Sequence, residues 1–294
     1  MRRLPTETKM NYTVEFCERE YNARAAIPDH PQIFARWAEQ AAATRRLRAC
    51  LVDLPYGESS AEKLDLFPAR SDNAPLFVFI HGGYWRSLDK SDFSWIAPPL
   101  VNHGIAVALL NYGLAPKTAL EDIVRQMLRA LAWLYRNADR YGFDPERIYV
   151  SGHSAGGHLT AMTMAALWDV YAPDLPRNLV KGGLAISGLY DLEPLVHAPF
   201  VNVDLKLDVR RARRLSPAYM PPATRAPLYT AVGALESSEF RRQNALIGKR
   251  WPQNFARDVP MPGCNHLTVC DELANPASPL FDAAIELVRR RVET

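Results

Sequence analysis

The chain has 294 residues, of which 48% are hydrophobic and 23% are charged, and its formal net charge is +3. This length suits one large α/β domain, which would bury about three quarters of the surface of its unfolded chain. The small net charge, together with arginine clusters at 210–214 and 289–291 that lack interleaved aromatic residues, argues against a nucleic-acid-binding protein.

The sequence shows no targeting or membrane-spanning segment. Nowhere do 18 apolar residues follow one another, and the N-terminal residues lack the apolar core of a signal peptide. We therefore expect a cytoplasmic protein with no membrane partner. Its cysteines have neither paired nor metal-finger spacing, so four free thiols are expected, at Cys17, Cys50, Cys264 and Cys270.

The N-terminal part is predicted to be an appendage of a larger domain. Residues 1–46 are expected to form a helical arm that is packed on a main domain of residues 47–294, and Pro28 and Pro31 divide this arm in two. Two short runs of alternating polarity follow, at 49–54 and 63–67. They indicate a half-buried antiparallel pair of strands at the edge of a sheet.

The rest of the chain alternates strands and helices. Nearly continuous apolar runs, typical of buried parallel strands, lie at 76–80, 105–110, 148–150, 183–186 and 228–232, with a last strand near 255–259. Helical stretches lie at about 93–102, 119–140, 155–169, 236–250 and 279–292. This alternation predicts an α/β fold with a mostly parallel, doubly wound sheet and an antiparallel N-terminal edge. Such sheets bind ligands at the carboxyl ends of their strands.

The segment 194–222 interrupts this alternation. It carries prolines at 194, 199, 217, 221 and 222 and shows little periodicity. Long irregular segments of this kind are either functional or merely mobile. Two interpretations therefore stay open, a cap excursion over the site and a surface loop without a role.

The strongest motif is Gly152-His153-Ser154-Ala155-Gly156-Gly157, which follows one apolar run and precedes a helical stretch. It fits the GxSxG nucleophile elbow, a tight strand-to-helix turn in which glycines remove side chains that would collide. The serine hydroxyl then stands clear of the sheet. We therefore predict Ser154 as the nucleophile.

A serine nucleophile needs a base, and the base needs a carboxylate that fixes its tautomer. In this type of fold the order along the chain is serine, acid, histidine. Glu236 follows the strand that ends at Val232, and His266 lies in a loop after the last strand. They are the predicted acid and base, and Asp191 is the rival acid. Cys264 is a weaker alternative nucleophile because it lacks an elbow.

His81-Gly82-Gly83-Tyr84-Trp85 follows the strand at 76–80. The backbone N–H groups of Gly82 and Gly83, together with that of Ala155, are predicted to form an oxyanion hole. Tyr84 and Trp85 are candidates for the wall of a substrate-binding site, although ordinary packing at a strand end explains aromatic residues equally well.

Several stretches across most of the chain resemble the serine-dependent kynurenine formamidases (arylformamidases) and their esterase relatives in the α/β-hydrolase superfamily. They are Glu18 to Asn22, His81 to Trp85, Gly152 to Gly157, Ser187 to Pro194, Glu236 to Phe240, and His266. The resemblance implies an α/β-hydrolase fold with Ser154 as nucleophile and His266 as base. Glu236 stands where formamidases usually carry an aspartate. The resemblance implies no metal and no cofactor.

Three functions remain open at this point. The first is hydrolysis of formyl groups from aryl amides of the N-formylkynurenine type, and the second is carboxylesterase activity on small aryl or short-chain esters. The third is non-catalytic ligand binding on a hydrolase scaffold. A small-molecule amide or ester is the expected partner, and whether the chain forms a homodimer is left open.

Overall fold

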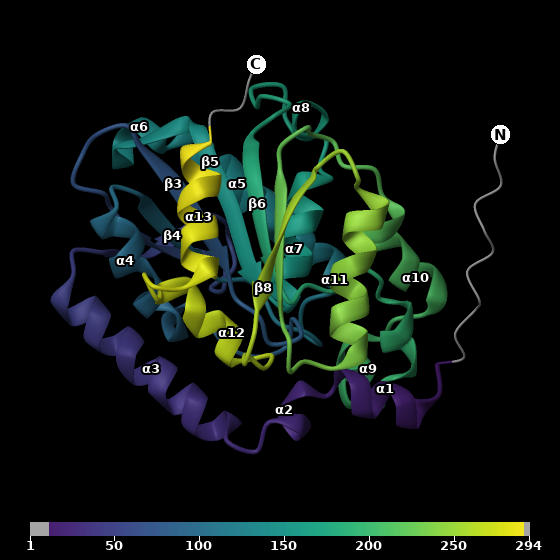
Figure 1. Ribbon diagram of the computed structural model, residues 1–294. Coiled ribbons are helices and arrows are strands. Elements are labelled where there is room, and N and C mark those ends of the chain that lie inside the picture. Colours follow the sequence, from purple (N-terminus) through teal and green to yellow (C-terminus); the bar gives the residue numbers. More distant parts are fainter. Residues whose placement is uncertain (1–11, 291–294) are drawn as a thin grey trace.

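The computed structural model describes residues 12–290, which form an eight-stranded sheet covered by helices on both faces (Figure 1). The strand order is β1-β2-β4-β3-β5-β6-β7-β8. The strands are β1 (Leu51–Pro55), β2 (Lys63–Phe67), β3 (Ala74–Ile80), β4 (Ala106–Leu110), β5 (Phe143–His153), β6 (Val180–Ile186), β7 (Leu228–Gly233) and β8 (Phe255–Met261). Strand β2 pairs antiparallel with β1 and with β4, and the remaining pairs are parallel. The predicted fold class is confirmed.

The register of the central strands brings their carboxyl ends to one edge of the sheet. Ile80 at the end of β3 pairs with Gly152 of β5, and His153 pairs with Ile186 at the end of β6. Ile186 pairs in turn with Ala231 of β7. Loops that follow these four strands therefore start side by side, as expected for the ligand-binding edge of an open parallel sheet.

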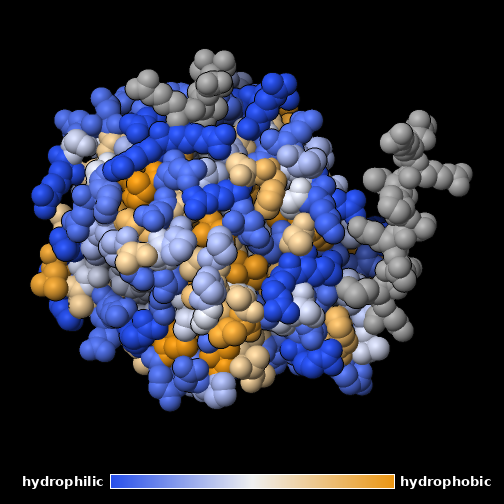
Figure 2. Space-filling view, viewed as in Figure 1, coloured by the Kyte–Doolittle hydropathy of each residue, from blue (hydrophilic) through white to orange (hydrophobic). Residues whose placement is uncertain are grey.

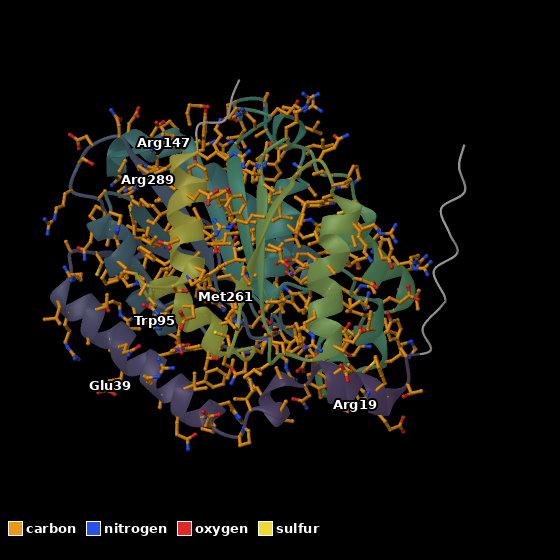
Figure 3. The ribbon with its side chains drawn as sticks, viewed as in Figure 1. Arg19, Glu39, Trp95, Arg147, Met261 and Arg289 are labelled. Atoms are coloured by element: carbon orange, nitrogen blue, oxygen red, sulfur yellow. The ribbon has the colours of Figure 1, made fainter. Side chains whose placement is uncertain are left out.

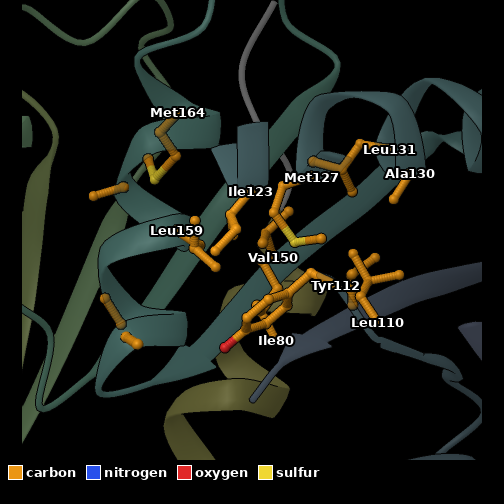
Figure 4. Close-up of a cluster of buried hydrophobic side chains, with 14 of the residues drawn as sticks. Ile80, Leu110, Tyr112, Ile123, Met127, Ala130, Leu131, Val150, Leu159 and Met164 are labelled. Atoms are coloured by element: carbon orange, nitrogen blue, oxygen red, sulfur yellow. The ribbon is translucent and has the colours of Figure 1, made fainter. Parts of the chain in front are cut away.

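Alternating side chains divide the core into two layers, because successive residues of a strand point to opposite faces of the sheet. Leu76, Val78 and Ile80 of β3 pack in one cluster, whereas Phe77 and Phe79 pack in the other. The first cluster lies under α5 (Leu120–Arg136) and α7 (Ala155–Met164) (Figure 4). The second lies under α3 (His30–Leu47), α4 (Ala97–Asn102) and α13 (Pro279–Arg289).

The longer helices are α1 (Val14–Tyr21), α3 (His30–Leu47), α4 (Ala97–Asn102), α5 (Leu120–Arg136), α7 (Ala155–Met164), α9 (Pro199–Leu205), α10 (Val209–Arg214), α11 (Ser238–Arg250) and α13 (Pro279–Arg289). One-turn helices are α2 (Ala23–Ala26), α6 (Ala138–Tyr141), α8 (Trp168–Tyr171) and α12 (Thr268–Asp271). Short 3₁₀ turns are η1 (Lys90–Asp92), η2 (Ser94–Ile96), η3 (Glu193–His197), η4 (Pro217–Tyr219) and η5 (Glu272–Ala274).

Some predicted helices begin later than the sequence pattern indicates. Helix α4 starts at Ala97, after two 3₁₀ turns, and Pro98 and Pro99 then occupy its first turn, the place in a helix that tolerates proline. Helix α11 starts at Ser238 because the Ser237 hydroxyl caps it by accepting a hydrogen bond from a backbone N–H. The residue before this cap therefore lies outside the helix.

The N-terminal arm, α1 to α3, runs along the edge of the sheet at which the strands end (Figure 1). Helix α3 is fixed by Trp37, whose Nε1 donates to Asp271 at 2.5 Å, and by the two hydrogen bonds of Arg36 to the same carboxylate. Helix α1 is fixed by Tyr21, whose hydroxyl donates to Glu239 at 2.6 Å. The first 11 residues of the predicted arm lie outside the described part of the chain.

The segment 194–222 connects β6 to β7 and is largely folded into η3, α9, α10 and η4. Phe200 of α9 packs edge-on against Tyr84, with ring centroids 5.5 Å apart. The excursion therefore reaches the loop that follows β3.

The face of the molecule shown in Figure 2 is mostly hydrophilic, with hydrophobic residues in small separate groups. Side chains fill the spaces between the sheet and its covering helices (Figure 3). In the same view, the labelled Arg19 lies on α1 and Glu39 lies on α3, both in the N-terminal arm. Among residues 12–290, none of the helices combines the length and the apolar character needed to cross a membrane.

Candidate active site

Ser154 lies at the apex of a sharp turn between β5 and α7. Its backbone has φ 57° and ψ −115°, a conformation that costs a non-glycine residue about 1–3 kcal/mol. The strand and the helix approach so closely that a Cβ on Gly156 would overlap the carbonyl oxygen of Ile80, and one on Gly152 would overlap the carbonyl oxygen of Gly156. Glycine at both positions therefore permits the turn that presents the Ser154 side chain at the edge of the sheet.

A continuous set of hydrogen bonds joins the three residues predicted as nucleophile, base and acid. Ser154 Oγ lies 3.0 Å from His266 Nε2, and His266 Nδ1 lies 2.6 Å from Glu236 Oε2. The other carboxylate oxygen of Glu236 accepts from Ser187 Oγ at 2.5 Å and from the N–H of Gly233 at 2.7 Å. A carboxylate held by three donors stays in place to fix the His266 tautomer, with its Nδ1 protonated and its Nε2 free to accept a proton.

The rival residues lie elsewhere. The carboxylate of Asp191 accepts from the N–H of Glu193 at 3.1 Å and faces Arg242 at 3.7 Å, and it makes no recorded contact with His266 in the described structure. Burial raises the pKa of the Cys264 thiol, which disfavours the thiolate that a cysteine nucleophile needs. The structure thus brings Glu236, and not Asp191, to the imidazole.

The amide groups predicted as an oxyanion hole lie around Ser154. A Cβ built on Gly82 would lie 3.2 Å from Ser154 Cβ, and Gly83 adopts a φ of +100° that favours glycine. Ala155 is the first residue of α7, so its N–H has no partner within the helix. Within residues 12–290 no hydrogen bond is recorded from the N–H of Gly82, Gly83 or Ala155. These donors are available to a substrate oxygen.

Two residues that the sequence interpretation did not assign hold the Gly82 loop. The Tyr112 hydroxyl donates to the carbonyl oxygens of His81 and Gly82, at 2.9 and 3.2 Å. The buried His81 ring stacks on Tyr112, with centroids 4.3 Å apart, and its Nε2 lies 3.2 Å from Asn111 Oδ1. Because the N–H of a trans peptide points opposite to its carbonyl, the N–H groups of Gly82 and Gly83 point away from Tyr112. The signal in the sequence was a histidine directly before the glycine pair.

His153 also has no role in the sequence prediction, although it directly precedes Ser154. Its ring is buried, and Nε2 lies 2.6 Å from the carbonyl oxygen of His266, so Nε2 carries the proton and holds the loop that bears the base. Burial, and to a lesser extent the neighbouring His266, lower the pKa of His153 to about 3. His153 is therefore a neutral positioning residue at ordinary pH.

The neutral buried histidines should make stability depend on pH. Burial lowers the pKa of His153 to about 3 and that of His158 to about 4, whereas an unfolded histidine titrates near 6.5. Between these values the unfolded chain binds protons that the folded state rejects. We expect the free energy of unfolding to fall on acidification from pH 6.5 toward 4, by up to about 1.4 kcal/mol per pH unit for each histidine. Urea unfolding at pH 7.5 and 5.0 measures this; a flat free energy would contradict neutral burial.

Ser154 and His266 both line a cavity at this edge of the sheet. Its walls include four aromatic side chains, which come from the arm, from the loop after β3 and from α9, namely Phe34, Trp37, Tyr84 and Phe200. The arm residues could not be assigned from the sequence, because their positions on a helix are those of any core-facing residue. Tyr84 lines the cavity as predicted, and its hydroxyl donates to the carbonyl oxygen of Tyr21 at 2.6 Å.

The prediction that Trp85 lines the substrate-binding site is wrong. Its side chain is fully buried in the first core cluster, edge-on to His158 at a centroid distance of 5.0 Å, and it does not border the cavity. Tyr84 and Trp85 both have positive φ values, 52° and 55°. This unusual turn sends the two consecutive side chains to different surroundings, which sequence patterns do not reveal.

Candidate metal ligands do not cluster in this structure. Among the described residues, no group of three or more His, Cys, Asp or Glu side chains could hold a metal ion. The four cysteines are free, and three of them are buried.

Comparison with known proteins places this geometry in context. A family model described as BD-FAE matches residues 64–169. The chain is 31% identical to a kynurenine formamidase of Salmo salar over 264 residues, 86% of either chain, and 31% identical to one of Danio rerio over 245 residues, 81% of this chain and 80% of that protein. Esterase LipQ of Mycobacterium tuberculosis is 30% identical over 162 residues, 50% of this chain and 37% of that protein.

Solved structures share the fold. A protein of Silicibacter sp. TM1040, described as a thioesterase candidate, superposes with a TM-score of 0.80 at 31% identity, covering 89% of this chain and 96% of that one. Esterase B of Lactobacillus rhamnosis superposes with a TM-score of 0.66 at 20% identity, covering 88% of this chain and 94% of that one. At that identity the second likeness supports the fold alone.

Proposed function

This chain belongs to the kynurenine formamidase family of α/β-hydrolases, and from that membership we propose that it hydrolyses small acyl groups, formyl in particular, from aryl amides through an acyl-enzyme. The observation that carries this proposal is the unbroken hydrogen-bonded path from Ser154 through His266 to Glu236. A serine hydroxyl becomes an effective nucleophile when an oriented base removes its proton. The same path argues against a non-catalytic binding protein, which has no need of it.

In the proposed reaction Ser154 Oγ attacks the acyl carbon while its proton passes to His266 Nε2. Glu236 holds the Nδ1–H and stabilises the imidazolium that forms. The amides of Gly82, Gly83 and Ala155 would bind the oxygen that becomes negative. His266 then gives its proton to the amine nitrogen as the C–N bond breaks. Water repeats the cycle on the acyl-serine, releasing the acid and restoring the hydroxyl.

The lining of the cavity supports an aromatic leaving group. Four aromatic side chains and two leucines surround the space above Ser154, and flat apolar walls of this kind bind an aryl ring well. The second candidate is a carboxylesterase that uses the same residues on aryl or short-chain esters. The esterase relatives favour it.

A comparison of acyl groups separates the two candidates. We expect kcat/KM for N-formylkynurenine to exceed kcat/KM for p-nitrophenyl butyrate by about 100-fold or more, because a site built for formyl leaves little room for three further carbons. p-Nitrophenyl acetate should lie between them, and the Ser154→Ala variant supplies the background rate. Equal or faster turnover of the butyrate would contradict the formamidase assignment and favour the carboxylesterase.

We also propose a cytoplasmic location. Four unpaired cysteine thiols support it, because disulfides form readily in oxidising compartments and are rare in reducing ones.

A further inference from the structure

Two arginines border the cavity that contains Ser154 and His266, and only one of them has an acidic partner. Arg86 Nη1 forms an ion pair with Asp204 Oδ2 at 2.7 Å. Arg24 of the arm has no carboxylate partner among residues 12–290, and its Nη2 donates instead to the hydroxyl of Ser87 at 2.6 Å. The cavity itself is lined by no aspartate or glutamate of the described chain. Its mouth therefore carries an unbalanced positive charge.

The surroundings of Arg24 hold its side chain at this place. Its guanidinium carbon lies 5.2 Å from the centre of the Phe34 ring, which is itself a wall of the cavity. Burial, followed by the charge of Arg86, lowers the pKa of Arg24. Arg24 is exposed to solvent, and two cations that border one space without a lining carboxylate favour an anionic ligand there. Such an arrangement in a cleft is typical of a ligand-binding residue.

We propose that Arg24 binds a carboxylate carried by the aryl leaving group of the substrate, so that the enzyme selects anionic aryl amides; this rests on the proposed function. One of the five guanidinium N–H donors is committed to Ser87, and the others remain for a planar carboxylate, which arginine binds in a two-pronged arrangement. The aromatic walls then hold the ring between Ser154 at the base of the cavity and Arg24 at its mouth.

Two substrates that differ in one charge test this proposal. They are 4-(2-formamidophenyl)-4-oxobutanoate and its primary amide, and release of the aniline is followed by absorbance. We expect the Arg24→Met variant to raise KM for the acid by about 10- to 100-fold and to change kcat by less than about threefold. The neutral amide should be cleaved equally by the variant and the parent enzyme. Arg24→Lys keeps the charge but loses the planar, two-pronged donor arrangement of the guanidinium. It should retain part of the preference for the acid over the amide.

Arg46→Met is the matched control, because Arg46 is an exposed arginine of the arm that does not line the cavity. It should leave both substrates unaffected. An equal loss on acid and amide in Arg24→Met would assign Arg24 a merely structural role and overturn the proposal. No change on either substrate would overturn it as well.

A binding measurement tests the role of Arg24 independently of the proposed reaction. In the Ser154→Ala background, calorimetry should show the acid bound at least about tenfold more tightly than the amide, and Arg24→Met should abolish that difference. If the parent enzyme cleaves neither substrate but shows this charge preference in binding, the proposed reaction fails and the role of Arg24 stands. Equal binding of acid and amide overturns the role of Arg24 whatever the reaction is.

Discussion

Replacement of Ser154 by alanine is expected to lower kcat by about five to six orders of magnitude on any substrate that the enzyme cleaves. The loss is this large because attack by the hydroxyl, proton transfer to His266 and formation of the acyl-enzyme all disappear together. KM should change little, since the cavity walls stay intact. Steady-state kinetics with purified variant and parent enzyme measure the effect, and residual activity above about 1% of the parent rate would contradict Ser154 as the nucleophile.

A second variant at the same position controls for folding. Ser154 holds φ at 57°, where glycine is unstrained, so Ser154→Gly should be inactive yet more stable than the parent by about 1 kcal/mol. Urea unfolding compares the two proteins. An inactive but more stable variant separates loss of the nucleophile from loss of the fold, because damage to the fold would lower the unfolding free energy.

Replacement of Glu236 by glutamine is expected to lower kcat by about three to four orders of magnitude. The amide keeps the shape of the carboxylate, but it no longer enforces the tautomer in which His266 Nε2 is free to take the Ser154 proton. Glu236→Asp keeps the charge and should cost far less, although its shorter side chain weakens the hydrogen bond from Ser187. Comparison of kcat for the two variants shows whether the charge of the Glu236 carboxylate or its exact position contributes more to the rate.

Asp191→Asn is the matched control for the acid. Asp191 is buried and its burial raises its pKa, but its carboxylate interacts with Glu193 and Arg242 rather than with the imidazole. We expect Asp191→Asn to keep kcat within about threefold of the parent enzyme, since it leaves the residues that contact the reacting atoms in place. A large loss in Asp191→Asn together with a small one in Glu236→Gln would reverse the assignment of the acid.

The sequence was informative wherever function depends on local backbone geometry. The turn at Ser154 needs small residues at fixed spacing, and the strand-end positions of Glu236 and His266 follow from the order of strands. The positions of β3 to β7 along the chain could also be anticipated, because buried parallel strands leave nearly continuous apolar runs. These features are set by residues close together in the chain.

The sequence was less informative wherever segments distant in the chain meet. Phe34 and Arg24 of the arm reach the cavity only because the arm crosses the carboxyl edge of the sheet, a contact that helical periodicity does not encode. Ser187 orients Glu236 across 49 positions of sequence, and no local motif marks that pairing. Trp85 was misassigned because a positive φ, which sequence patterns rarely reveal for a tryptophan, turns its side chain into the core.

The central claim is that His266 and Glu236 make the Ser154 hydroxyl reactive. Incubation of the intact protein with a fluorophosphonate at neutral pH, followed by peptide mass spectrometry, tests it directly. We predict one equivalent of label on the peptide that contains Ser154, and far slower labelling in Glu236→Gln. An unlabelled Ser154 in folded protein, or label at another residue, would contradict the claim.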